Sequence, residues 1–321
     1  MMIYRFTYPK YLALTLRKLV FTFLVMVVSF SVFGDNDYLR GEHIEPAYEG
    51  WWENEDGTFT LVFGYMNENW EEEIDVPIGD ENYFSPGALD RGQPTHFLPR
   101  RNRFTFEVVV PADWKDREVV WTLTSNGKTR KAYAQILTDY VLDDVTIASE
   151  TGALGGGTSS PESRLNTAPV SELLGDTVEG NHIRNVRVGE KLLLAAKVVD
   201  DGLPKPRATS EFIKRVPLGL RLLSPPGRIT VSRFNGLFHS WSMYRGAGEV
   251  SFDPPQVKIW EDTRPSANSP WGAYWNPPPV PEDGIYETEV IFHEPGTYVL
   301  WGRADDGALY DDQYVTVQVS P

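Results

Sequence analysis

Six aspartates are the residues of this 321-residue chain whose types and spacing best suit a chemical role. They follow two segments of alternating apolar residues and comprise Asp200, Asp201, Asp305, Asp306, Asp311 and Asp312. In a β-sandwich whose corresponding loops emerge at one end, the carboxylates converge and repel one another by about 1 kcal/mol per close pair in water. Ca²⁺ binds about six to eight oxygen ligands and would relieve this repulsion. We therefore predict a Ca²⁺ site, with Asp200, Asp201, Asp305 and Asp306 as the first choices for ligands.

The same residues also have a purely structural interpretation. Asp-Asp-Gly is a common turn sequence, because Asp bonds to its own backbone and Gly accepts a positive φ. The chain also lacks the D-x-[DN]-x-[DN]-G spacing of an EF-hand loop. Turns without calcium are therefore the alternative to the metal site.

A second candidate is the aromatic, proline-rich stretch 269–279, which contains Trp271, Tyr274 and Trp275. Aromatic side chains on a loop offer flat apolar faces against which a sugar ring or a peptide can stack. The alternative is that these rings cover a gap in the fold, because Trp is usually well buried. We predict a binding role for the three residues, with an unknown protein or a glycan as the partner.

Motifs for covalent catalysis are missing from the sequence. No cysteine is present, which excludes disulfides, thiolate metal sites and cysteine nucleophiles. There is no G-x-S-x-G elbow, no S-x-x-K with its companion motifs and no phosphate-binding loop. The five histidines lack metal-ligand or catalytic spacing, and His96, near Arg91 in a turn-rich stretch, is expected to belong to a hydrogen-bonded turn. No catalytic residue is predicted, and the sequence favours a protein that is not an enzyme.

The N-terminus has the layout of a secretory signal peptide over residues 1–34. Four basic residues precede an apolar run at 19–33, which is shorter than the roughly 20 residues needed to span a bilayer. Cleavage after residue 34 removes four positive charges and no negative one, so the net charge changes from −15 to −19. Such a chain repels nucleic acids and anionic lipids. We expect an exported bacterial protein, periplasmic or extracellular, with no stable membrane span after cleavage.

Apolar residues alternate with period two through most of the remaining chain, which is typical of β-strands. A first all-β domain is predicted over 38–144, where an Asn126-Gly127 pair indicates a tight hairpin turn. Gly, Ser and Pro then accumulate in a predicted linker at 148–165. The second domain, 166–321, contains seven strand-like segments, which suit a β-sandwich. They are 190–199, 237–244, 249–252, 257–260, 286–292, 297–303 and 313–319.

The second domain resembles immunoglobulin-like domains of the polycystic-kidney-disease (PKD) repeat type. The resemblance rests on Val188-Gly189-Glu190, the Asp-Asp-Gly-Leu-Pro stretch at 200–204, Trp241, the stretch 244–252, Glu294 to Leu300 and Ala304-Asp305-Asp306-Gly307. It implies that Trp241 and Tyr298 are structural residues, on a middle and on the penultimate strand. It also implies a spacer, adhesion unit or binding unit. The stretch 90–97 of the first domain resembles parts of exported bacterial proteins that have no assigned activity.

Together these features predict an all-β chain of two immunoglobulin-like or β-sandwich domains after a signal peptide. The favoured function is a non-catalytic exported binding or adhesion protein that Ca²⁺ can stabilise. One alternative is a carbohydrate-active enzyme or its accessory binding protein, which would use Trp271 and Trp275 for stacking. The other is a structural spacer subunit of a surface assembly.

Overall fold

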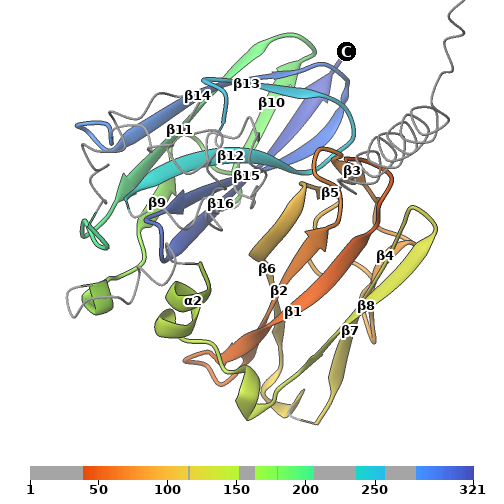
Figure 1. The fold of residues 1–321 in the computed structure, drawn as a ribbon. Coiled ribbons are helices and arrows are strands. Elements are labelled where there is room, and N and C mark those ends of the chain that lie inside the picture. Colours follow the sequence, from red (N-terminus) through yellow and green to blue (C-terminus); the bar gives the residue numbers. More distant parts are fainter. Residues whose placement is uncertain (1–38, 115, 152–162, 179, 206–235, 257–279) are drawn as a thin grey trace, which may run out of the picture. The chain divides into compact units, whose positions relative to one another are not determined.

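The computed structural model describes residues 39–321, except for 115, 152–162, 179, 206–235 and 257–279. Strands make up 54% and helices 7% of the structure, which confirms the all-β prediction. Contacts along the chain make residues 39–321 one compact unit, and the strands of this unit fall into two groups (Figure 1). The predicted signal peptide at 1–34 lies outside the described residues. Within the described part of the chain, no helix has the length and apolar character needed to cross a membrane.

The first group is built from two three-stranded antiparallel sheets. One has the order β1-β2-β6 and the other β4-β7-β8, with a small β3-β5 pair beside them. The strands are β1 (Ile44–Glu53), β2 (Phe59–Asn67), β3 (Ile74–Asp75), β4 (Asn82–Ser85), β5 (His96–Phe97), β6 (Arg100–Val110), β7 (Glu118–Ser125) and β8 (Lys128–Gln135).

Aromatic side chains fill the core of the first group. Phe63 on β2 packs against Phe106 on β6 and Phe84 on β4, and the Trp121 ring on β7 stacks on Phe84. All four side chains are buried, as period-two alternation requires of the inward face of a strand. The hairpin predicted at Asn126-Gly127 joins β7 to β8, and both residues have positive φ angles, 45° and 74°.

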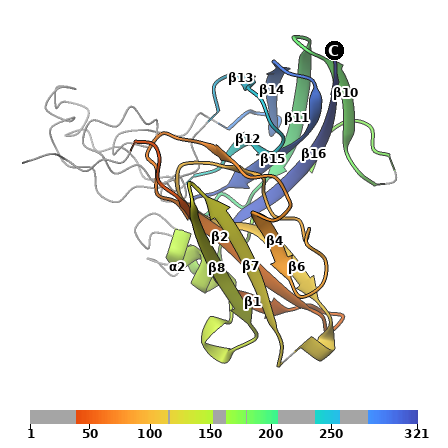
Figure 2. The ribbon, with the colours of Figure 1, turned by 90° about the vertical axis from the view of Figure 1, so that its right-hand side faces the viewer.

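The second group is a sandwich of two four-stranded sheets. Their orders are β9-β11-β14-β13 and β12-β15-β16-β10, and only the β10–β16 pair is parallel (Figure 2). The strands are β9 (Val170–Leu173), β10 (Ile183–Arg187), β11 (Lys191–Val199), β12 (Phe238–Arg245), β13 (Val250–Asp253), β14 (Ile285–Phe292), β15 (Gly296–Asp305) and β16 (Tyr310–Ser320). In chain order these sheets reproduce the ABED and CFG arrangement of immunoglobulin domains, with β10 added along the last strand.

Two side chains mark the second group as immunoglobulin-like. Trp241 on β12, the third strand of this arrangement, is 1% exposed and lies so close to Gly302 that a Cβ there would be 2.7 Å from the ring. The hydroxyl of Tyr298, near the start of β15, donates to the carbonyl of Glu294, which is the contact of a tyrosine corner. The structural roles predicted for Trp241 and Tyr298 are therefore confirmed.

Several elements differ from the sequence prediction. β9 and β10 were not among the expected strands, because each is short and its apolar residues do not alternate with polar ones in the sequence. Helix α2 (Asp144–Thr151) was not expected either, and it includes 148–151, the start of the predicted linker. Its low amphipathicity explains the miss, although Ile147 and Ala148 are buried. The predicted strand at 257–260 lies outside the described residues. Short 3₁₀ turns occur at Ala112–Trp114, Thr138–Tyr140 and Ser163–Leu165.

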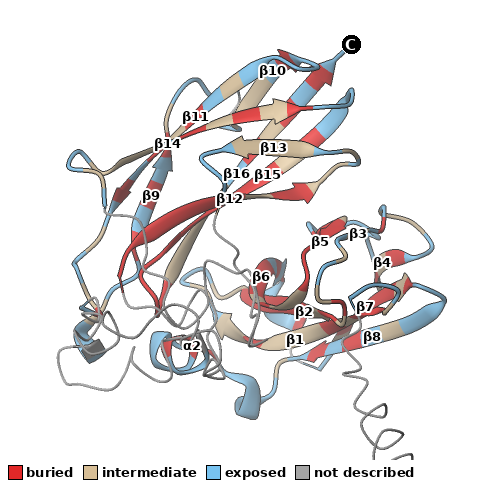
Figure 3. Ribbon diagram, turned by 45° about the horizontal axis from the view of Figure 1, so that its top comes forward, coloured by how far each residue is buried: buried red, intermediate tan, exposed pale blue. Residues whose placement is uncertain are grey.

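The stretch 90–97, which the sequence analysis singled out, joins the two groups of strands. The backbone NH of Thr95 donates to the carbonyl of Tyr244 on β12, and the Tyr244 hydroxyl donates to the carbonyl of Gly92. Asp90 forms a two-bond ion pair with Arg245, at 2.7 and 2.9 Å. Strands β5, β6 and β12 all contain buried residues, which are red in Figure 3.

Candidate functional site

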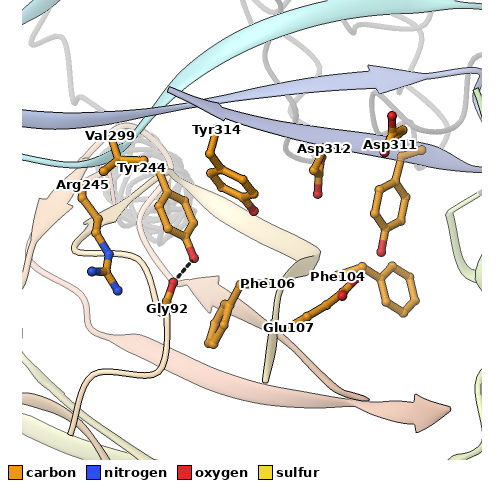
Figure 4. A pocket seen from close by; sticks show the side chains of 11 residues that line it. Gly92, Phe104, Phe106, Glu107, Tyr244, Arg245, Val299, Asp311, Asp312 and Tyr314 are labelled. Atoms are coloured by element: carbon orange, nitrogen blue, oxygen red, sulfur yellow. Dashed lines mark hydrogen bonds between the residues drawn. The ribbon is translucent and has the colours of Figure 1, made fainter. Parts of the chain in front are cut away.

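A cavity of about 590 Å³ lies between β6 of the first group and strands β12, β15 and β16 of the second. Its lining includes Phe104, Phe106 and Glu107 from β6, with Tyr244, Tyr310, Asp312 and Tyr314 from the second group. Figure 4 shows Tyr244, Tyr314 and Asp312 reaching from one wall toward Phe106, Glu107 and Phe104 on the other. We call this the aromatic cavity.

Alternation along β16 turns one face of this strand toward the aromatic cavity and the other toward the sandwich core. Val315, Val317 and Val319 point into the sandwich core. Tyr310, Asp312 and Tyr314 have the opposite parity, so they lie on the outer face of that sheet. An outer face with two tyrosines is unusual for a solvated strand, and here the first group of strands covers it. Tyr314 remains 39% exposed.

Two β-bulges aim further side chains at the cavity. The pairing of β2 with β6 shifts register between Phe63 and Tyr65, and Phe104 on the bulged strand has a φ of 49°. The pairing of β12 with β15 shifts between Met243 and Arg245, which leaves Tyr244 as the extra residue. Bulges re-aim side chains and are common beside functional sites. The Phe104 ring consequently stacks on Tyr310, and the Tyr244 ring meets Tyr314 at 65°.

Arg303 is a buried cation that lies behind the lining of the aromatic cavity, where it binds Asp312. Its guanidinium makes two hydrogen bonds of 2.8 Å to Asp312 and a third to the carbonyl of Phe104. It also lies 3.8 Å from the centre of the Tyr310 ring and 4.5 Å from that of Trp301. Such cation–π contacts are favourable because the ring face is negative. The charge of Asp312 is therefore neutralised within the protein.

Glu107 differs from the other charged groups of the cavity. Its side chain makes no hydrogen bond or ion pair with any part of the chain that the structure describes, and it remains exposed on the cavity wall. Partial desolvation by the walls raises its pKa, repulsion by Asp312 adds to this, and Arg303 opposes it. Glu107 is thus a carboxylate held beside aromatic rings with no partner of its own.

A second cavity, of about 420 Å³, lies beside β5 and β12 and includes His96 in its lining. His96 is bonded through Nδ1 to Asp75 at 2.8 Å and through Nε2 to Glu73 at 3.0 Å. Burial alone would lower the pKa of His96, but the bonds to Asp75 and Glu73 outweigh it and raise the pKa to about 9. We call this the histidine cavity. His96 was expected in a turn, but it lies on β5, with its ring between two carboxylates.

The six predicted aspartates do not form one cluster. Asp200 and Asp201 accept backbone bonds from Gly202 and Leu203, and Asp201 also accepts two bonds from Thr167. Asp305 and Asp306 accept bonds from the loop that follows them, while Asp311 binds Ser171 and Asp312 binds Arg303.

These partners bear directly on the calcium hypothesis. Each of the six carboxylates already accepts hydrogen bonds within the chain, as expected for turns and strand contacts. Over the described ranges, no group of three or more His, Asp or Glu side chains is arranged to hold a metal ion. Among the described residues these carboxylates therefore serve turns and strand contacts and are not gathered around one ion, and calcium binding stays a prediction. Thermal unfolding in a chelator, compared with Ca²⁺ or Mg²⁺ at matched ionic strength, would test it.

The predicted binding residues Trp271, Tyr274 and Trp275 lie outside the described residues, and their role stays a prediction. The sequence analysis did not select Glu107, Tyr244, Tyr310 or Tyr314 as site residues. A signal for two of them was present in Tyr310-Asp311-Asp312-Gln313-Tyr314, where both tyrosines share the face opposite the valines that follow. Aromatic residues on the polar face of a predicted strand indicate that something covers or binds that face.

Comparison with known proteins does not place the chain in a family. No family model matches it, and no curated protein matches it. Among solved structures, the D00–D0 domain of intimin matches with 10% identity and a TM-score of 0.23, covering 86% of this chain and 99% of that one. A chimeric titin Z1Z2 matches with 9% identity and a TM-score of 0.21, covering 86% and 97%.

A nucleoside hydrolase-related hypothetical protein from Saccharophagus degradans matches with 15% identity and a TM-score of 0.26. That match covers 60% of this chain and 36% of the other. Likenesses at these scores carry no argument about function. The immunoglobulin-like character of the second group rests on its own strand order, on Trp241 and on the Tyr298 corner.

Proposed function

We propose that the protein is a non-catalytic exported binding protein and that the aromatic cavity is its binding site. The observation that carries this proposal is a cavity of about 590 Å³ walled by aromatic rings from both groups of strands. Sites for small ligands typically have volumes of about 300–1,000 Å³ and mostly apolar walls, with a few polar groups that fix orientation. The aromatic cavity has this size and this kind of lining.

The backbone around the cavity supports the same proposal. Both bulged strands turn an aromatic residue toward the cavity, and the Tyr314 hydroxyl donates to the carbonyl of Thr105 on the bulged segment of β6. The rings are therefore held by contacts between the two groups of strands. A preformed site of this kind loses little conformational entropy when a ligand binds.

Export is the second part of the proposal, and the basic and then apolar N-terminal sequence supports it. The destination is the periplasm or the exterior of a bacterial cell. Assignment of the second group to the PKD type is likewise proposed, on the residues that resemble that family. Such modules serve in binding, adhesion or spacing, and the aromatic cavity favours binding among these roles.

The test is a thermal unfolding screen of the purified protein with neutral oligosaccharides, organic amines and short peptides. A ligand at 100 times its dissociation constant stabilises the folded state by about 2.7 kcal/mol. We expect at least one stabilising compound whose effect is lost in Tyr314→Ala. Tyr133→Ala is the matched control, because Tyr133 is 56% exposed on β8 and does not line the aromatic cavity.

The outcomes separate the alternatives. If no compound stabilises the protein, or if Tyr314→Ala responds like the parent, the aromatic cavity is not the site and a spacer role gains weight. If an oligosaccharide stabilises the parent but not Trp271→Ala/Trp275→Ala, the stretch 269–279 is the binding element, as the carbohydrate alternative predicts.

A further inference from the structure

The polar groups of the aromatic cavity limit which ligands it can recognise. A neutral sugar needs several free donors and acceptors around its hydroxyls. The Tyr244 and Tyr314 hydroxyls donate to the carbonyls of Gly92 and Thr105, and the Arg245 guanidinium bonds to Asp90 and Gln93. Both carboxylate oxygens of Asp312 accept bonds from Arg303. These groups are occupied by the protein itself.

Glu107 is left as a free carboxylate beside the rings. The geometry points to a substituted ammonium cation as the ligand of the aromatic cavity, with Glu107 as its counter-charge and the tyrosine and phenylalanine rings around its alkyl groups. This inference rests on the proposed function, since it names the ligand class of the same site. Ammonium groups bind favourably over aromatic faces, most strongly when they are desolvated.

The ring geometry fits a cation of this kind. Tyr244 and Tyr314 have centroids 5.2 Å apart and planes at 65°, so together they form a corner that can contact a rounded cation from two sides. The wall already holds one cation by the same chemistry, because Arg303 lies over the face of Tyr310. The protein therefore already uses one ring of this cavity, that of Tyr310, as a cation-binding surface.

The charge balance also favours a cation. Glu107, Arg245, Asp311 and Asp312 line the cavity, and the ion-pair partners of Arg245 and Asp312 add Asp90 and Arg303. Four negative and two positive charges give a sum of −2. Arg303 and Arg245 are each bound to a carboxylate, so neither repels a ligand as a free charge would. The acidic net charge of the whole chain, −15, attracts cations in the same sense.

The test compares two probes of equal shape that differ in charge. Choline carries a quaternary nitrogen, and 3,3-dimethylbutan-1-ol has a carbon atom in its place. By calorimetry on the full chain at low salt, we expect choline to bind at least tenfold more tightly than the alcohol. In Glu107→Gln the advantage of choline over the alcohol should disappear. Glu287→Gln removes the same charge from an exposed position on β14 and should keep the advantage.

Each other outcome overturns the inference. Equal or tighter binding of the alcohol, absence of binding by choline, or an unchanged choline advantage in Glu107→Gln would show that the site does not select a cation. The proposed function has its own criterion. If a neutral compound stabilises the protein and Tyr314→Ala abolishes the effect, the aromatic cavity is a binding site and only the cation inference fails. If nothing binds, both fail.

Discussion

A buried cation lies at each of the two cavities, Arg303 behind Asp312 of the aromatic cavity and His96 in the lining of the histidine cavity, and the two cations are held in different ways. Arg303 is paired with a single carboxylate, Asp312, whose side chain is 17% exposed, and it also contacts two aromatic faces. His96 is bonded to two carboxylates, Glu73 and Asp75, whose side chains are 48% and 43% exposed. The Arg303–Asp312 pair is thus almost removed from water, whereas the two carboxylates that hold His96 are about half exposed to water.

This difference determines how each cavity responds to its surroundings. An arginine keeps its proton at every pH a protein experiences, so the charge of Arg303 does not change with pH. Histidine loses its proton within the accessible range, so the charge of His96 depends on pH. A site for a charged ligand is better built beside a charge that pH does not alter. The comparison therefore favours the aromatic cavity for binding and gives His96 a structural role.

The largest effect is expected from Arg303→Met. Breaking a buried ion pair by removing one partner typically costs about 3–5 kcal/mol, because the remaining charge is left without compensation. Urea unfolding should show a loss of this size, and Arg303→Met/Asp312→Leu should recover part of it. Arg117→Met is the control, since its pair with Asp113 is exposed and should change stability by less than about 1 kcal/mol. A loss below 1 kcal/mol in Arg303→Met would show that Asp312 is solvated after all.

A smaller loss, about 2 kcal/mol, is expected from His96→Leu at pH 7. The variant removes two charge-assisted hydrogen bonds, but Glu73 and Asp75 can turn toward water, which limits the cost. The same unfolding measurement checks this. His293→Leu provides the matched control, because His293 is exposed and its ring is bonded only to the Ser251 hydroxyl among the described residues. A loss as large as that of Arg303→Met would mean that the two cavities hold their cations equally tightly.

The pH dependence of stability should distinguish the two cations further. The pKa of His96 is raised from 6.5 to about 9, so its contribution is complete below pH 6.5 and is lost as the pH rises through 9. Between pH 7 and pH 9.5 we expect the parent to lose about 1–2 kcal/mol more than His96→Leu, after allowance for the solvated carboxylates. If the free energy of unfolding fell equally with pH in the parent and in His96→Leu, His96 would not be the group that causes the loss.

The alternation of apolar residues was sufficient to predict most strands. It was not sufficient to predict the aromatic cavity and the histidine cavity. Alternation located β6, β7 and β11, because each has one face that is more deeply buried than the other. It also located β2, whose larger apolar residues alternate although both faces of this middle strand are buried. Short or weakly amphipathic elements such as β9, β10 and α2 gave no such signal, since contacts from distant segments stabilise them. The Asp-Asp-Gly turns were visible as turns, and the Asx bonds of Asp200 and Asp306 agree with that interpretation.

The aromatic cavity could not be found from one segment alone. Phe104 and Tyr244 face it because of bulges, and a register shift is not encoded in the alternation of either strand taken by itself. Glu107 and Tyr314 are about 200 residues apart in sequence, and only the packing of the two groups of strands brings them to one cavity. His96 was noticed as a residue, but Glu73 and Asp75 became its partners only through the pairing of β3 with β5.

The smallest effect concerns the stability of Glu107→Gln. Because desolvation and Asp312 raise the pKa of Glu107, the folded state disfavours its ionised form, and ionisation as the pH rises above 4.5 destabilises the fold. Glutamine does not ionise, so the variant should be slightly more stable than the parent at pH 7, by less than about 1 kcal/mol, and equal to it near pH 4. Urea unfolding at the two pH values measures the difference, with Glu287→Gln as the control for net charge. If Glu107→Gln were instead less stable than the parent at pH 7, Glu107 would have a favourable partner within the protein. Its carboxylate would then not be available to a cation, and the aromatic cavity would lose the free negative charge that distinguishes it from the histidine cavity.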